Sequence, residues 1–113
     1  MVEKQWLFLQ LLSDLIQWAK ANDLVLTGGE LYRTPEQAAL NASKGIGITT
    51  SLHTQRLAID LNLFINGTYQ SDSEAYRSLG EFWKTLNPLC RWGGDFNNKK
   101  DGNHFSLEDN GIK

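Results

Sequence analysis

The sequence predicts an α+β protein, in which about three helices pack on a small, mainly antiparallel sheet. Two patterns indicate this class. Apolar residues recur at helical spacing near the start of the chain, and over 57–65 they alternate with other residues, as in a strand with one buried face. The 113 residues, 41% of them apolar, suffice for one hydrophobic core, so we expect a single domain over 1–113.

Two helices and a short strand are predicted in the first part of the chain. The first helix covers about Glu3 to Asn22, where polar residues separate the apolar ones at helical spacing. A short buried strand follows over 24–26. The next helix, over about 34–43, begins at Thr34-Pro35, an N-cap residue followed by a proline in the first helical position. We expect it to end before the glycines of 45–47.

The main strand of the sheet is predicted over 57–65. Its leucines and isoleucines take every second position, so one face of the strand is apolar. Asn66-Gly67 follows, a dipeptide typical of a two-residue hairpin turn, and Thr68-Tyr69 begins the returning strand.

The last part of the chain supplies a third helix and two short strands. The helix is predicted over 71–87 and is stopped by Pro88. Residues 89–92 and 103–107 are the two strands, joined by a polar loop over 93–102.

Charge, cysteine content and hydropathy exclude several classes of protein. The net charge of -2 argues against nucleic acid as a partner. Cys90 is the only cysteine, so the fold cannot depend on an intramolecular disulfide, and we expect a buried structural thiol. Polar residues interrupt the apolar ones from Met1 to Lys20, which favours neither membrane insertion nor a secretory signal. We therefore expect synthesis in the cytoplasm.

Two histidines and one aspartate form the most informative pattern. His53 and Asp60 are seven residues apart at the entrance to the main strand, and His104 stands at the start of the last strand. Two histidines and a carboxylate are a ligand set of open catalytic zinc sites, which leave one position for water. The alternative is a solvated His53 and a half-buried His104 that bonds only to backbone.

Simple geometry sets conditions on this site. Because side chains alternate along a strand, His53 and Asp60 can share a site only if a turn or bulge lies between them. Asp60 lies within an apolar strand, where an unpaired carboxylate is costly to bury, so it requires a partner. Asp101 precedes His104 by three residues and could stand near the metal as the general base.

These residues resemble a known pair of motifs. Ser51-x-His53-x6-Asp60 and Asp101-x-x-His104-Phe105 resemble the motifs SxHxxGxAxD and DxxHF of the LAS zinc peptidases. The branch that they resemble contains D-alanyl-D-alanine carboxypeptidases and L-alanyl-D-glutamate endopeptidases, including small phage endolysins. Two further segments, 31–37 and 91–95, are similar to the family's G-Y-R-S-x-x-x-Q and W-G-G stretches.

The resemblance implies a fold, a cofactor and roles for particular residues. The fold is that of the LAS group, also called hedgehog or D-Ala-D-Ala peptidase-like. His53, Asp60 and His104 would hold Zn2+, with Asp101 as the catalytic acid and base. Arg33 would bind the substrate or polarise its scissile carbonyl, unless it forms only a surface ion pair. The other substrate-binding candidates are Ser51, which could instead orient the His53 loop, and Gln37, which could instead cap a helix.

The chain departs from the family pattern at two positions. Arg56 replaces the glycine between the first two ligands, which puts the local turn and the shape of the groove in question. Ser106 stands where the family often has glutamate after His-Phe. A carboxylate that orients a metal ligand would then be missing, at a cost of about 10-fold or more in metal affinity or activity.

The leading functional hypothesis is a zinc endopeptidase that cuts peptidoglycan stem peptides between L-alanine and D-glutamate. A single catalytic domain without a wall-binding module resembles endolysins of phages that infect Gram-negative hosts. We expect a monomer that reaches the wall, in the periplasm, after a holin opens the inner membrane and that contributes to host lysis. One alternative is a D-alanyl-D-alanine carboxypeptidase or dipeptidase, and the other is a non-catalytic peptidoglycan-binding module. Retention of Asp101 argues against the module.

Overall fold

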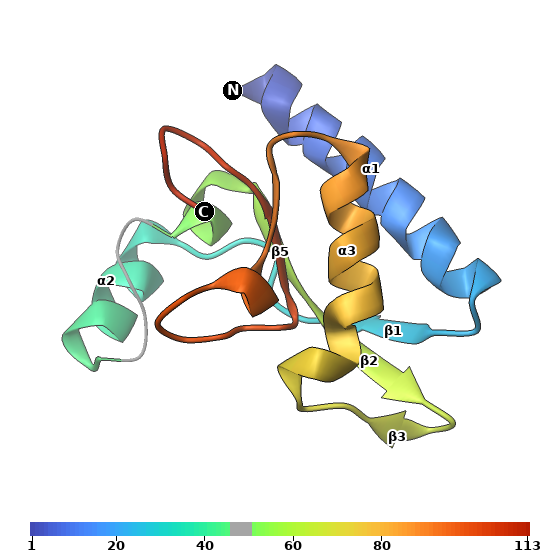
Figure 1. The fold of residues 1–113 in the computed structure, drawn as a ribbon. Coiled ribbons are helices and arrows are strands. Elements are labelled where there is room, and N and C mark those ends of the chain that lie inside the picture. The colour runs from blue at the N-terminus through green and yellow to red at the C-terminus, as the bar shows by residue number, and fades with distance from the viewer. Residues whose placement is uncertain (46–50) are drawn as a thin grey trace.

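A computed structural model describes residues 1–45 and 51–113 of the chain, and Figure 1 shows its fold. Four strands form one antiparallel sheet in the order β1-β2-β5-β4, and β3 pairs with the far end of β2. Their bounds are β1 Val25–Gly28, β2 Ala58–Ile65, β3 Thr68–Tyr69, β4 Cys90–Trp92 and β5 His104–Leu107. The last strand therefore lies between two strands that precede it in the sequence.

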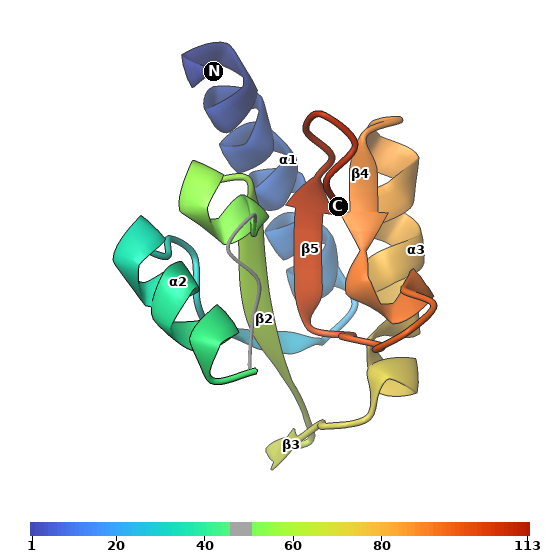
Figure 2. The same ribbon diagram turned by 90° about the vertical axis from the view of Figure 1, so that its left-hand side faces the viewer.

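The helices lie on both sides of this sheet. Helices α1 (Val2–Ala21) and α3 (Arg77–Leu86) pack side by side against one face, and α2 (Pro35–Ser43) lies on the opposite side (Figures 1 and 2). Among the described residues, no helix combines the length and the apolar character that a membrane span requires.

The core lies between the sheet and the pair α1 and α3. Trp83 of α3 is completely buried at its centre and contacts Phe8 of α1 and Phe105 of β5, both edge-to-face. The indole Nε1 of Trp83 donates to the carbonyl oxygens of Arg91 and Ser106, at 3.0 and 3.2 Å, and so joins β4 to β5. This contact fixes β4 against β5, the strand that begins with His104.

The predicted fold class is confirmed. Thr34 caps α2, since its hydroxyl accepts from the amide of Gln37 at 3.0 Å. The helix ends at Ser43, and residues 46–47 of the predicted glycine stop lie outside the described residues. Cys90 is buried, which raises the pKa of its thiol to about 12.

The third helix differs from its prediction. Residues 73–76 form a 3₁₀ turn, and the α-helix begins only at Arg77. The hydroxyl of Tyr76 donates to the carbonyl of Gln70 at 2.8 Å and accepts from the amide of Leu63 at 3.1 Å. Tyr76 is thereby held against β2, and residues 73–76 form a 3₁₀ turn at this contact instead of the first turn of α3.

Candidate metal centre

A short turn places His53 above the sheet. Residues Leu52–Gln55 form a 3₁₀ helix, whose first amide groups lack partners within the turn. The hydroxyl of Ser51 accepts from the amide of His53 at 3.2 Å and caps the turn. At its end Arg56 adopts left-handed backbone angles, φ 59° and ψ 34°, and the chain enters β2. This is the turn that the sequence required between His53 and Asp60.

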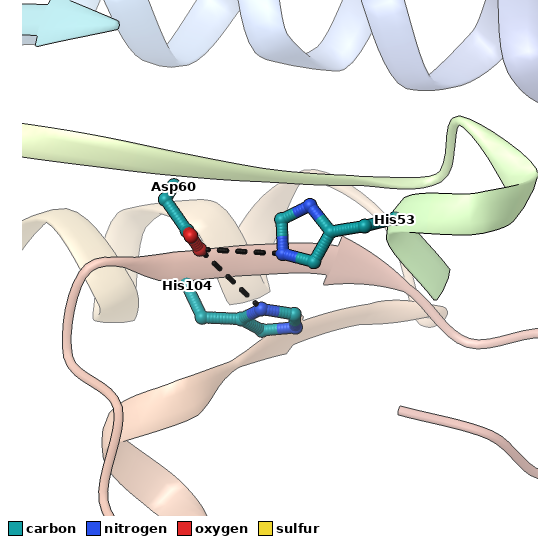
Figure 3. A group of neighbouring side chains, drawn as sticks. All are labelled: His53, Asp60 and His104. Atoms are coloured by element: carbon teal, nitrogen blue, oxygen red, sulfur yellow. Dashed lines mark ion pairs between the residues drawn. The ribbon is translucent and has the colours of Figure 1, made fainter. Parts of the chain in front are cut away.

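The pairing of β2 with β5 brings the other two residues together. Asp60 and His104 are direct cross-strand partners, so their side chains leave the same face of the sheet. This face is opposite to the one that α1 and α3 cover. His53 reaches the same point from the preceding turn, as Figure 3 shows. Oδ1 of Asp60 lies 3.4 Å from Nε2 of His53 and 3.7 Å from Nδ1 of His104.

The Asp60 carboxylate is charged, and one of its oxygens has no hydrogen-bond partner among the described residues. Oδ1 is buried and forms no hydrogen bond within 1–45 and 51–113, although a buried polar atom normally has one. Burial alone would raise the pKa of Asp60, but the two histidines outweigh it and lower the pKa to about 2. Burial likewise acts to lower the pKa of His53, and the Asp60 carboxylate reverses this effect, so the pKa of His53 is raised.

Each histidine has one nitrogen toward Asp60 and the other toward a backbone carbonyl. Nδ1 of His53 lies 3.3 Å from the carbonyl oxygen of Leu31, and Nε2 of His104 lies 3.2 Å from that of Lys113. A carbonyl oxygen can only accept, so these two nitrogens carry the protons. The lone pairs on Nε2 of His53 and Nδ1 of His104 are then free to bind a metal ion.

The donor set fits a tetrahedral metal ion. One nitrogen from each histidine and one carboxylate oxygen lie within 4.8 Å of one another. Ligands at 2.0–2.1 Å from a tetrahedral zinc ion are separated by roughly 3.3 Å. The observed separations of 3.4 and 3.7 Å are too long for good hydrogen bonds but close to this value. A bound cation would also give the buried Oδ1 of Asp60 its missing partner.

The three residues lie in the wall of a cavity of about 500 Å³, which also contains the predicted base. Arg33, Ser51 and Asp101 line the same cavity. Asp101 is exposed, yet partial desolvation of its carboxyl raises its pKa. The negative charge of Asp60 also acts to raise this pKa, whereas the two histidines act to lower it. Ionisable groups with opposed pKa shifts in one cavity are typical of acid–base chemistry.

The part of the chain that carries this site is similar to a known protein family. A family model described as D-alanyl-D-alanine carboxypeptidase matches residues 45–107, which is more than half of the chain and includes all three candidate ligands and Asp101. The chain belongs to the LAS family of metallopeptidases. It is therefore assigned to the peptidases, and Arg33 and Gln37 lie outside the matched residues.

A solved structure shares the LAS fold. It is the crystal structure of the L-Ala D-Glu endopeptidase ChiX of Serratia marcescens, with a TM-score of 0.66 and 20% sequence identity. The similarity covers 75% of this chain and 68% of that chain. The comparison with curated proteins gives no match.

The departure from the LAS pattern at Arg56 leaves the turn intact. Glycine adopts left-handed angles without steric cost, and Arg56 adopts the same region at some cost. Its guanidinium lies 3.9 Å from the centre of the Tyr32 ring, a cation–π contact that offsets part of this cost. The bulky side chain thus stacks on Tyr32, and Arg56 supports the turn that glycine forms elsewhere in the family pattern.

Gln37 is not placed at the cavity. Its side chain is exposed on α2 and donates to Oδ1 of Asn41 at 2.6 Å, one helical turn away. Its backbone amide is the group that Thr34 caps. The predicted substrate contact therefore has no support, and helix capping accounts for the Thr34-x-x-Gln37 spacing.

One residue near the site was not predicted from the sequence. Glu30 forms an ion pair with Arg33, and its Oε1 lies 3.6 Å from Nδ1 of His53. Backbone hydrogen bonds explain its position: the amide of Asp60 donates to the carbonyl of Glu30, and the amide of Gly29 donates to that of Asp60, both at 2.8 Å. The chain after β1 thus runs beside Asp60. An acidic residue three before Arg33 was the available signal.

Proposed function

We propose that the protein is a zinc-dependent endopeptidase that cleaves peptidoglycan stem peptides between L-alanine and D-glutamate. The observation that carries the proposal is the convergence of His53, Asp60 and His104 on one point in the wall of a cavity that Asp101 also lines. Membership of the LAS family supports peptide hydrolysis, and the shared fold with an L-Ala D-Glu endopeptidase is consistent with the choice of bond. All three donors come from one chain, so a monomer has a complete site.

The proposed chemistry divides between the metal and the side chains. His53, Asp60 and His104 would hold the zinc ion, whose Lewis acidity would lower the pKa of water from 15.7 to about 7. Asp101 accepts a proton from the attacking water and delivers it to the nitrogen of the leaving amine, so that one water and one peptide give a carboxylic acid and an amine. The raised pKa of Asp101 favours proton uptake at this step.

The cavity wall matches an anionic peptide. Arg33, Lys99 and Lys100 line it, and stem peptides carry free carboxylates near the proposed bond. The ion pair with Glu30 holds the guanidinium of Arg33 in place at this wall. A fixed guanidinium is suited to a substrate carboxylate or to the scissile carbonyl.

Mass spectrometry of fragments released from Gram-negative peptidoglycan tests the proposal. The zinc-loaded protein should free stem peptides from the glycan at L-alanine. Asp101→Asn should retain stoichiometric zinc and wall binding but lose nearly all turnover, because its amide cannot accept the proton. Normal cleavage by Asp101→Asn would remove the acid–base role from this residue.

The same experiment distinguishes two other functions. Release of free D-alanine with intact cross-links would indicate a D-alanyl-D-alanine carboxypeptidase, which the description of the family model favours. Arg33 would then bind the terminal carboxylate. An absence of products despite bound zinc would indicate a peptidoglycan-binding module or a different substrate.

We also propose that the protein acts as an endolysin, made in the cytoplasm and released to the wall by a holin. The resemblance to small phage endolysins supports this route. Expression in a Gram-negative bacterium should lyse the cells only when a holin is expressed with it. Lysis without the holin would contradict the route but not the enzymatic activity.

A further inference from the structure

The backbone oxygen of Lys113 contacts two side chains of β5. It lies 3.2 Å from Nε2 of His104, and it accepts a hydrogen bond from the hydroxyl of Ser106 at 2.8 Å. Ser106 and His104 are two residues apart on the same face of the strand, and both are buried. One backbone oxygen therefore supports the nitrogen of His104 that faces away from Asp60.

A small hairpin holds this oxygen in place. After β5 the chain turns at Asn110-Gly111, and two backbone hydrogen bonds, of 3.0 and 2.8 Å, join Asp109 to Ile112. The side chain of Ile112 packs against the core, and the carboxylate of Asp109 accepts from Nζ of Lys4 in α1 at 3.0 Å. Residues 108–113 are thus tied to the molecule on both sides of the turn.

We propose that Ser106 and this hairpin, residues 108–113, position His104 for metal binding. The inference rests on the proposed zinc site. Because the backbone oxygen of Lys113 accepts a hydrogen bond from the Nε2–H group, it selects the tautomer whose Nδ1 has a free lone pair and fixes the orientation of the ring. This oxygen supplies an acceptor for Nε2 of His104 in a chain that has serine, not glutamate, at position 106, and the Ser106 hydroxyl holds that oxygen.

The two histidines are then supported in equivalent ways. Nδ1 of His53 contacts the carbonyl of Leu31, and Nε2 of His104 contacts that of Lys113. Partners of this kind typically change metal affinity by 10- to 100-fold when they are removed. The expected loss of affinity from the absent carboxylate is therefore avoided in this chain, and it reappears when Ser106 or the hairpin is altered.

The first test compares two serine substitutions by competition with a zinc chelator. Ser106→Ala removes the hydroxyl that holds the Lys113 carbonyl, and it should raise the Kd for zinc about 10-fold. Ser43→Ala is the control, since Ser43 also donates to a backbone carbonyl, that of Leu40 at 2.7 Å, but on exposed α2. The control should leave the Kd unchanged. An unchanged Kd in Ser106→Ala would overturn the proposal.

A second test uses two matched turns and does not alter the buried site. Asn110-Gly111 has φ values of 49° and 78°, and Asn66-Gly67 between β2 and β3 has values of 50° and 79°. An added Cβ meets no atom within 4 Å at either glycine, so alanine introduces the same backbone strain in both. Gly111→Ala should weaken zinc binding several-fold and Gly67→Ala should not, whereas both should lower Tm by similar amounts.

Two further readouts separate positioning from stability. In the metal-free protein, nitrogen NMR should find the His104 proton on Nε2, and Ser106→Ala should mix the two tautomers. A purely structural role would lower the Tm of the metal-free and zinc-loaded forms equally, with no change in Kd, and would overturn the proposal. Failure of the wild-type protein to bind zinc would instead overturn the proposed function.

Discussion

At the scale of single residues, Asp60 shows how a charge is tolerated in an apolar strand. Its neighbours Ile59 and Leu61 face the core, while its carboxylate lies between two histidine rings on the other face. The histidines keep it ionised far below neutral pH. The cost of desolvation is offset only because these partners are present, so the three residues depend on one another.

This dependence predicts that each ligand is required for zinc. Asp60→Asn, His53→Ala and His104→Ala should each lose stoichiometric zinc, because each removes one of three donors. Metal analysis after gel filtration measures the content. Asp101→Asn is the matched control and should retain one zinc per chain. Retention of zinc by any of the first three variants would remove that residue from the site.

The raised pKa of His53 predicts an unusual pH dependence in the metal-free protein. A histidine whose pKa is raised by folding adds stability below its ordinary value of about 6.5, and this stability is lost as the pH rises through the raised pKa. Metal-free protein should therefore have a higher free energy of unfolding at pH 6 than at pH 8, measured by urea denaturation, and His53→Gln should reduce the difference.

Zinc should reverse this trend. Protons compete with the metal for the histidine nitrogen, so the stabilisation by zinc grows between pH 6 and pH 8. Metal-free stability that is flat or rises over this interval would contradict the raised pKa of His53.

At the scale of secondary-structure elements, α3 is fitted closely to β4. Gly80 of α3 lies against the ring of Trp92, and a Cβ at Gly80 would be 2.1 Å from a ring atom. Trp92 is itself fixed, because it is buried and its Nε1 donates to the carbonyl of Gly102 at 2.6 Å. The ring cannot move aside without losing this hydrogen bond to Gly102, the residue that follows Asp101.

Gly80→Ala should therefore destabilise the protein. Within a helix this change usually stabilises by up to about 1 kcal/mol, whereas overpacking costs about 1–3 kcal/mol. We expect a net loss and a Tm several degrees lower by calorimetry. Ser78→Ala, at an exposed position of the same helix, is the control and should change stability by about 0.5 kcal/mol or less. An increase in Tm for Gly80→Ala would show that Trp92 can repack.

Most elements were predictable because their signals are local. The Thr34-Pro35 start, the Asn66-Gly67 turn and the alternation over 57–65 each lie within a few residues. The start of α3 was not predictable, because the Tyr76 hydroxyl accepts a hydrogen bond from Leu63 of β2, 13 residues earlier.

The supports of the two histidines also lie beyond the reach of a local signal. Every residue has a backbone oxygen, so the sequence does not indicate that those of Leu31 and Lys113 contact the histidines. The pairing that brings Glu30 beside Asp60 joins segments 30 residues apart. The sequence predicted the three side chains that converge at the proposed metal site, and the structure was needed to find the backbone groups behind them.

At the scale of the whole molecule, a bound metal ion would connect separate parts of the fold. His53 comes from the turn before β2, Asp60 from β2 and His104 from β5. An ion that binds only the folded chain stabilises it by RT ln(1 + [L]/Kd), about 2.7 kcal/mol at 100 times Kd.

Removal of zinc should thus lower Tm by roughly 10 °C in a domain of this size. Scanning fluorimetry with and without a chelator measures the shift. His104→Ala, which lacks a ligand, should show no zinc-dependent change. A wild-type Tm that is insensitive to zinc at saturating concentration would contradict a site that joins these elements.

The position of β5 between β2 and β4 has a consequence for the synthesis of the protein. A ribosome makes both neighbouring strands before it makes the strand that separates them, and this strand carries His104. A nascent chain that extends only to β4 has two of the three proposed donors, and the strand that pairs with both β2 and β4 is still absent. Hydrolytic activity therefore cannot begin before translation has passed β5 and this strand has inserted between its neighbours.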